Sequence, residues 1–298
     1  MKIKEQVKLE GRSIISSFDR KRPSVKVGYV ICYLIAVAVA VSTLYPLIWV
    51  FLGSLKDAKE IFRMPPTFLP DKYLWGNYLR AWQVYEIPRV FKNTVFVFAG
   101  FTFVRLVVLS TAAYAFSHLK LPFRHGLYLI FLATLMLPFF AYIIPAYLVV
   151  FQLGLLDSFW GIWLPAGADS FSLLLLKNFF DGIPQDLFEA AKIDGASELK
   201  ILRKIVIPLS KPIVAVLGIF AFMHVWKDFL WQRIILTSAS NWTISIALWY
   251  RSLSDQGAVL PQNVQLAGLL LSTLPPAVIF VIFQKYIIQG VTFSGLKS

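Results

Sequence analysis

The stretch EAAKIDGASELKILRKIVIPLSKP, residues 189–212, is the segment from which the rest of the chain is best understood. It is polar and charged and has a helical rhythm, whereas long apolar runs lie on both sides of it. Charged side chains are costly inside a bilayer, so we expect this segment to lie outside the membrane, between two spans. Which side it faces, and what it does there, depends on the rest of the sequence.

The composition indicates a polytopic membrane protein. Of the 298 residues, 58% are hydrophobic and 15% are charged, and the mean hydropathy is +0.68. Soluble domains carry roughly 45–50% apolar and about 25% charged residues. The net charge of +13 comes from basic residues in the tails and in short loops beside apolar runs, so we expect membrane orientation and no nucleic-acid binding. The single cysteine, Cys32, excludes an internal disulfide.

Six apolar runs are long enough to cross a membrane, which takes about 20 residues each. Several contain proline, which membrane bundles tolerate when neighbouring groups satisfy the freed carbonyls. The first run is too long for the apolar part of a signal peptide, and we expect it to remain as a span. The sequence therefore predicts an all-α fold with about six transmembrane helices, at residues 27–55, 90–117, 127–153, 159–180, 213–236 and 264–287.

Lysine and arginine residues between the spans predict the orientation. The N-terminal tail (1–26) and the loops after the second and fourth spans are basic, whereas the loop around Asp157 and Asp169 has neither Lys nor Arg. The positive-inside rule places both termini in the cytoplasm, with a permease domain at 27–288 and a C-terminal tail at 289–298. Loop 56–89 is net basic and breaks the pattern, but it is long enough to be translocated regardless of charge.

The same rule places residues 181–211 in the cytoplasm. Pro184 suits the start of a helix, because its missing N–H costs nothing there, and Asp186 favours the first turn through the helix dipole. Gly195 interrupts the pattern, Ser197 can cap a second helix, and Pro208 ends it. We expect two short helices with a bend at Gly195.

One face of the first of these helices is apolar. Leu187, Phe188 and Ala191 fall on it at helical spacing, and the small pair Ala190-Ala191 leaves a flat spot that suits close approach by another surface. From the residues alone, a helix that simply lies on the membrane interface explains this pattern as well as a docking site does.

The spacing of the segment resembles a known family. Glu189-Ala190-Ala191, three residues, Gly195, nine residues, Ile205, one residue and Ile207-Pro208 is similar to the EAA loop of ABC importer permeases, E-A-A-x3-G-x9-I-x-L-P, with only Ile207 in place of Leu. We therefore call residues 181–211 the EAA loop. Four further windows resemble the carbohydrate branch of that family, typified by the smaller membrane subunit of the maltose importer: residues 54–78, 112–122, 226–231 and 283–298.

The resemblance implies a type I ABC importer permease fold and a mechanical role. In that family the loop docks in a cleft of a cytoplasmic ATPase subunit, and closure of the ATPase dimer switches the pathway between inward and outward access. A C-terminal tail, here Gln289, Gly290 and the residues after them, reaches toward the ATPase dimer interface; an ordinary frayed terminus is the alternative. By matched position, the ATPase-coupling residues are Glu189, Ala190, Ala191, Gly195, Ile205 and Pro208.

The residues indicate no catalysis in this chain. No G-x-x-x-x-G-K-[ST] motif is present, so ATP and magnesium are expected on a separate ATPase chain. His118, His125 and His224 lack zinc-site spacing and cysteine partners, so we expect packing or solvated roles, no metal and no cofactor. The sequence is that of a transport subunit and not of an enzyme.

Charged and aromatic residues within the spans leave two interpretations open. Arg105 falls in the middle of the second span, and Lys227 and Asp228 lie in the fifth. These charges either neutralise one another, Asp228 with Arg105 or near Lys227, or border a translocation pathway, because such residues are functional by default. A buried cation would also suit an anionic saccharide. The candidate pathway residues are Trp226, Asp228, Trp231, Gln232 and Arg105.

The predicted protein is therefore a multi-pass permease subunit of a prokaryotic cell membrane, in a binding-protein-dependent sugar importer whose expected substrates are oligosaccharides. Its expected partners are a homologous second permease, two ATPase subunits, an extracytoplasmic binding protein that meets loops 56–89 and 233–262, the sugar and membrane lipid. An importer of a non-sugar solute and an ion-coupled secondary transporter are the alternatives. The latter would require inverted repeats, and no convincing repeat is present.

Overall fold

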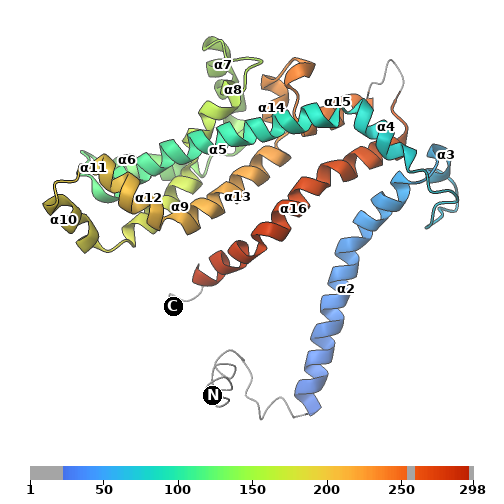
Figure 1. Cartoon of the computed structure of the whole chain (residues 1–298), viewed down its shortest axis with the longest axis horizontal. Coiled ribbons are helices and arrows are strands. Elements are labelled where there is room, and N and C mark those ends of the chain that lie inside the picture. The colour runs from blue at the N-terminus through green and yellow to red at the C-terminus, as the bar shows by residue number, and fades with distance from the viewer. Residues whose placement is uncertain (1–22, 254–258, 295–298) are drawn as a thin grey trace. The chain divides into compact units, whose positions relative to one another are not determined.

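The structure, a computed structural model, describes residues 23–253 and 259–294, and in that part it consists of helices joined by short turns (Figure 1). The chain divides into two compact units, Met1–Leu74 and Trp75–Ser298.

The first unit is built on one long helix, α2 (Pro23–Ser54). Its most apolar stretch has no buried side chains within the chain. A helix that is apolar on all sides requires a lipid or protein environment around it. The span expected at residues 27–55 is therefore present as a continuous helix.

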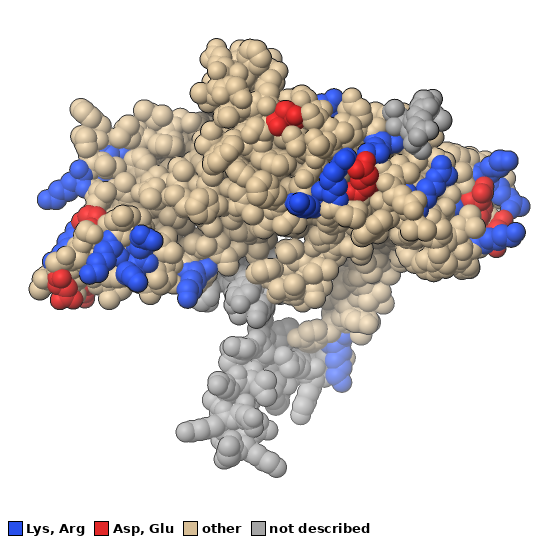
Figure 2. All heavy atoms as spheres, turned by 45° about the horizontal axis from the view of Figure 1, so that its top comes forward, with Lys and Arg blue, Asp and Glu red and all other residues tan. Residues whose placement is uncertain are grey.

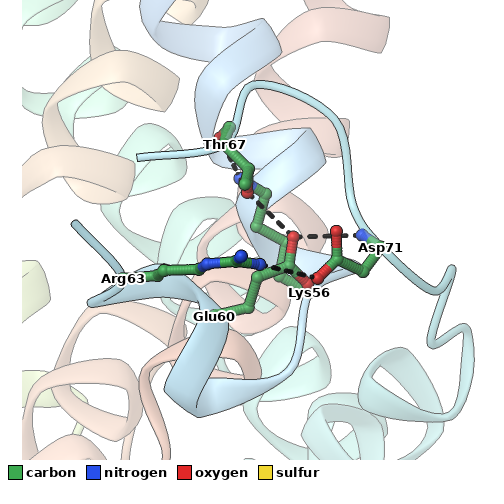
Figure 3. Close-up of polar contacts among 5 residues, drawn as sticks. All are labelled: Lys56, Glu60, Arg63, Thr67 and Asp71. Atoms are coloured by element: carbon green, nitrogen blue, oxygen red, sulfur yellow. Dashed lines mark hydrogen bonds and ion pairs between the residues drawn. The ribbon is translucent and has the colours of Figure 1, made fainter. Parts of the chain in front are cut away.

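A compact loop follows α2 and contains the short helix α3 (Ala58–Ile61). Glu60 is its centre: its carboxylate accepts hydrogen bonds from the Thr67 hydroxyl (2.9 Å) and the Asp71 amide (3.0 Å), while Lys56 donates to Thr67 (Figure 3). An Arg63–Asp71 ion pair at 3.3 Å lies on its surface. The loop is thus ordered by its own polar contacts and presents a defined surface.

The second unit is organised around α5 (Ile87–His118), the long helix that α8, η2, α9 and α13 all contact (Figure 1). Three apolar clusters follow one another along it. One lies at its His118 end, one in its middle, and one at its Ile87 end with α4, α15 and α16. The remaining elements of this unit before the EAA loop are α4 (Gly76–Val84), α6 (Arg124–Thr134), α7 (Phe139–Gln152), α8 (Trp160–Trp163), η2 (Leu164–Ala168) and α9 (Ser170–Asp181).

The elements after the EAA loop complete the bundle. They are α13 (Lys211–Lys227), α14 (Leu230–Ile235), η4 (Ala239–Asn241), α15 (Ile244–Leu253) and α16 (Gln262–Ser294). Helix α16 continues past the expected boundary at residue 288, so the backbone at Gln289 and Gly290 is helical.

Within the described residues, three helices (α2, α5 and α16) are long and apolar enough to cross a membrane, and up to five spans result if each bent pair of helices counts as one. The expected third span is such a pair: α6 and α7 meet at 107°, next to Pro138, which lacks a backbone donor. The fifth is also not a single helix, because the extended backbone at Asp228 separates α13 from α14. The predictions of one continuous helix at 127–153 and one at 213–236 were therefore wrong.

The expected fourth span, residues 159–180, is broken into α8, η2 and α9. It nevertheless runs beside α5 and in the same direction. The Trp163 indole donates to the Val97 carbonyl at 3.1 Å, and further along both segments His118 Nε2 lies 3.3 Å from the Phe180 carbonyl. Gly100 makes the contact with α8 possible, because a Cβ there would lie 2.0 Å from the Trp163 ring. The broken segment thus accompanies α5 over most of its length.

Candidate functional site

The EAA loop contains two helical parts with a sharp bend between them. The first is α10 (Gln185–Ile193), and the second comprises α11 (Glu198–Ile201), the π-helical turn η3 (Leu202–Val206) and α12 (Ile207–Leu209). Gly195 has φ +72°, a left-handed conformation that favours glycine, and open space surrounds its missing side chain. The expected bent two-helix form is confirmed, although the Ser197 side chain makes no capping hydrogen bond.

One face of the EAA loop is buried against the bundle. Phe188 is 1% exposed, and Ile201 and Val206 are also buried, in a cluster with residues of α5, α9 and α13. Leu187, expected on the same apolar face, is instead 41% exposed. The loop is thus seated on the ends of the membrane helices and does not merely lie on a lipid surface.

The opposite face of the loop is free within this chain. Glu189, Ala190 and Gly195 are exposed. Beside them, Ile193 is 87% exposed and Leu199 is 59% exposed. Apolar side chains this exposed among polar neighbours are typical of a protein contact surface. Of the other expected coupling residues, Ala191 and Ile205 are half-buried and Pro208 is exposed.

A polar network ties the two parts of the loop together. Glu198, the first residue of α11, accepts a hydrogen bond from the Tyr114 hydroxyl of α5 and forms an ion pair with Lys192 of α10 at 3.0 Å. The Tyr114 hydrogen bond, together with Lys192, holds the pKa of Glu198 below its usual range against a smaller opposing effect of burial. Because the folded-state pKa is depressed, this contribution to stability is present at neutral pH and is lost only as the pH falls through that lowered value.

The loop surface also carries a basic hollow. It has a volume of about 520 Å³ and is lined by Ser197, Leu199, Lys200, Arg203 and Lys204. Lys and Arg side chains gather over the end of the molecule that carries α10 to α12 and also over the opposite end of the view, while the surface between them has few charges (Figure 2). This distribution is typical of a loop outside the bilayer beside a membrane-embedded bundle.

The expected pathway residues do not form one open surface. Trp231 is 7% exposed, and Gln232 is fully buried, its amide donating to the Val225 carbonyl at 2.7 Å and accepting from the Thr243 hydroxyl. The Trp226 indole donates to the Ser272 carbonyl at 3.1 Å, which ties α13 to α16. Within this chain these three side chains hold helices together.

Asp228 sits at the break between α13 and α14. Its carboxylate accepts a hydrogen bond from the Trp231 amide at 3.1 Å, and its own carbonyl accepts one from the Ser245 hydroxyl. The expected pairing of Asp228 with Arg105 was therefore wrong: Asp228 stabilises the first turn of α14. Its neighbours Lys227 and His224 are exposed on α13. Polar side chains on a membrane helix face protein or water in preference to lipid, and sequence reasoning had not singled out His224 for such a position.

Arg105 forms a buried ion pair with Asp169 at 2.6 Å. Asp169 also accepts a hydrogen bond from the Ser172 amide and so begins α9, which places it within the fourth segment and not in the loop before it, where it was expected. The Arg105 guanidinium lies over the Phe101 ring, 5.0 Å from its centroid, and His224 stacks on the same ring. The charge of Arg105 is thus compensated inside the chain.

The side chains of Gln289 and Gly290 lie outside the described residues. Among the His, Cys, Asp and Glu residues that are described, no group of three or more is arranged to hold a metal ion.

Long apolar helices and a bent helical loop exposed at one end of the bundle indicate a polytopic membrane protein. A family model described as "binding-protein-dependent transport system inner membrane component" matches residues 106–293, and the chain belongs to this family. It is a multi-pass membrane protein of transport type, and not an enzyme.

Relatives agree with this assignment along nearly the whole chain. The sn-glycerol-3-phosphate transport system permease protein UgpE of Yersinia enterocolitica is 30% identical over 272 residues, 89% of this chain and 96% of that protein. Protein LplC of Bacillus subtilis is 30% identical over 275 residues, 86% of this chain and 90% of that protein.

A solved structure shares the fold. It is a chain of a bacterial ABC transporter involved in the import of the acidic polysaccharide alginate, with a TM-score of 0.79, 24% sequence identity, and coverage of 89% of this chain and 98% of that chain. The expected type I permease fold is thereby confirmed.

Proposed function

We propose that this chain forms half of the translocation pathway of an ATP-driven importer that takes up a sugar or a sugar-like solute. It pairs with a homologous permease chain, two ATPase subunits bind the cytoplasmic side, and an extracytoplasmic binding protein delivers the solute. Both termini are cytoplasmic in this arrangement. ATP and magnesium bind the ATPase subunits. The helices of this chain move in response and open the pathway to one side of the membrane or the other.

The exposed face of the EAA loop is the observation that carries this proposal. Ala190 and Gly195 form a small-residue surface beside the exposed Glu189, and the apolar side chains of Ile193 and Leu199 that flank it are exposed. Covering such a surface with a partner lowers the free energy of the complex, because apolar area is removed from water. A cleft in a soluble ATPase subunit is the partner that fits a loop of this size and position.

The outer surfaces suit a binding protein. The loop after α2 is fixed by Glu60 and its hydrogen bonds, so its polar surface is formed before a partner arrives (Figure 3). In the other unit, Asp157 accepts two hydrogen bonds from Ser238 and thereby joins the α7–α8 turn to the segment after α14. Preformed surfaces lose little conformational entropy on docking.

The sugar class has two supports. The sequence windows at 54–78, 112–122, 226–231 and 283–298 resemble carbohydrate permeases. The relative UgpE carries the name of a transporter for sn-glycerol-3-phosphate, a phosphorylated polyol. A solute outside this class remains the second candidate, and transport assays with purified binding protein and candidate solutes distinguish the two.

Replacing Glu189 by Lys tests the proposed docking. The substitution reverses a charge on the exposed face while leaving the buried side of α10 unchanged, so the permease should still enter the membrane. We expect the ATPase subunit to be lost from the purified complex and solute uptake to stop. The measurement is co-purification of the ATPase with the tagged permease, together with uptake in cells.

Lys120→Glu provides the matched control. It reverses an exposed charge on the short loop between α5 and α6, at the same end of the bundle as the EAA loop. It should leave the ATPase bound. If both variants keep the ATPase, the proposed docking face is wrong. If transport follows an ion gradient without any ATPase, the proposed function is wrong and an ion-coupled transporter replaces it.

A further inference from the structure

The EAA loop is joined to α5 by contacts that the docking face does not include. The chain connects the loop covalently only to α9 before it and α13 after it. Helix α5 ends at His118 and belongs to a different part of the sequence. Any movement of the loop therefore reaches α5 only through side-chain contacts.

Two of these contacts lie side by side. The Phe188 ring of α10 stacks on the His118 ring, with centroids 4.0 Å apart and an interplanar angle of 28°. Next to it, the Tyr114 hydroxyl donates a hydrogen bond to the Glu198 carboxylate. Tyr114 is 3% exposed and Phe188 is 1% exposed, so the ring contact lies beneath the loop. The Glu198 side chain is 43% exposed, so its hydrogen bond with Tyr114 lies at the edge of the buried face.

The Glu198 carboxylate connects three elements. One oxygen accepts from Tyr114 of α5, and the other pairs with Lys192 of α10, while Glu198 itself begins α11. A hydrogen bond to an ionised acceptor is stronger than a neutral one and fixes the relative position of its partners. The bend at Gly195 is thus bridged, and the two halves of the loop are fastened to α5 together.

From this arrangement we infer that Tyr114 and Glu198 form a latch that transmits movement of the EAA loop to α5. The inference rests on the proposed function, because it requires an ATPase that moves the loop. The latch holds the loop and α5 in one rigid piece, so that closure of the ATPase subunits shifts α5 together with the Arg105–Asp169 pair along it. Tyr114 and Glu198 are positioning residues: they contact neither ATP nor the solute.

The test is Tyr114→Phe in the complete importer, reconstituted in lipid vesicles with its binding protein. Phenylalanine keeps the buried ring and removes only the hydroxyl. We expect the ATPase subunits to remain bound and ATP hydrolysis to stay near the wild-type rate. The number of solute molecules taken up per ATP hydrolysed should fall roughly tenfold, the size of effect expected for one charge-assisted hydrogen bond.

Tyr128→Phe is the matched control. Tyr128 of α6 packs against Phe116 with ring centroids 5.8 Å apart, and its hydroxyl has no hydrogen bond in the described part of the chain. This variant should keep the wild-type ratio of uptake to ATP hydrolysis. An equal ratio in the Tyr114→Phe and Tyr128→Phe importers would overturn the latch, as would loss of the ATPase from the Tyr114→Phe complex.

A second comparison separates the latch from general loosening of the bundle. In a Glu198→Ala background the hydrogen bond is already absent, so adding Tyr114→Phe should lower the ratio no further. If Tyr114→Phe lowers it as much in that background as in the wild type, the two residues do not act together and the inference fails. Glu189→Lys, measured in parallel, reports on docking: retention of the ATPase there overturns the proposed docking face, and uptake without any ATPase overturns the proposed function, whereas failure of the Tyr114 test alone overturns only the latch.

Discussion

Gly195 shows how one residue determines the shape of the docking face. Its φ of +72° is strained for a residue with a Cβ, but nothing lies within 4 Å of the position that a Cβ would occupy. A substitution there therefore meets backbone strain and no steric clash. The cost for alanine in this conformation is about 1 kcal/mol.

Gly195→Ala should weaken binding of the ATPase subunit about fivefold, because about 1 kcal/mol of strain is relieved when the bend relaxes out of its docking shape. Gly195→Asn should weaken it less, since asparagine tolerates the left-handed region better than alanine. Titration of the ATPase subunit onto permease in lipid nanodiscs measures both. Equal affinities for all three proteins would show that the bend is not needed for docking.

At the scale of helices, the Arg105–Asp169 pair explains how a broken segment is held beside α5. Asp169 lies at the junction of η2 and α9 and begins α9 through its contact with the Ser172 amide. Arg105 of α5 supplies the opposite charge at 2.6 Å. Breaking a buried pair by removing one partner is costly, whereas replacing both by neutral groups is often tolerated.

Arg105→Leu should therefore destabilise the permease by about 3 kcal/mol, since it leaves the Asp169 carboxylate without its partner. Adding Asp169→Asn should recover most of the loss, because asparagine is neutral and still accepts a capping hydrogen bond. Thermal unfolding of the detergent-solubilised proteins tests this. The double variant also tests whether Arg105 recognises an anionic saccharide: unchanged uptake of every acidic saccharide offered would exclude that role.

These elements also show what the sequence could predict. Long apolar runs are sufficient to locate α2, α5 and α16, because a continuous spanning helix leaves a continuous pattern. Composition cannot show that the fourth segment breaks at Asp169 or that α13 ends at Lys227. The first break is held by Arg105 of α5, and at the second the Asp228 carbonyl accepts a hydrogen bond from Ser245 of α15.

The same contrast holds for the site. The exposed half of the EAA loop follows from local spacing, which made Glu189 and Gly195 predictable. The contacts on its buried side do not follow from local spacing, because Tyr114 and Glu198 are 84 residues apart in the sequence. A tyrosine near a helix end and a glutamate after a serine carry no local signal that they meet. Phe188 and Ala191 were the residues of that side with a signal, their place on an apolar face, and both belong to or pack against the cluster at the His118 end of α5.

At the scale of the whole chain, the distribution of charge and the direction of the segments must give one consistent topology. Helix α5 and the broken segment from α8 to α9 run in the same direction, as the contacts Trp163–Val97 and His118–Phe180 establish. Parallel neighbours in a membrane require an intervening segment that returns, and the bent pair α6 and α7 lies between them in the sequence. The described residues give up to five spans when each bent pair counts as one, and the broken segment makes a sixth. The proposed topology, with both termini on the same side of the membrane, requires this even number.

Cysteine labelling tests this topology, and the net-basic loop 56–89 is the critical case. After Cys32→Ser removes the native thiol, Lys72→Cys and Lys120→Cys each supply one exposed cysteine. A membrane-impermeant maleimide should label Lys72→Cys in intact cells, because a long loop crosses regardless of its charge. It should label Lys120→Cys only after permeabilisation, since that residue shares its side of the membrane with the EAA loop. Labelling of Lys120→Cys in intact cells would show that the topology is the reverse of the proposed one. The EAA loop would then lie outside the cell, away from any cytoplasmic ATPase.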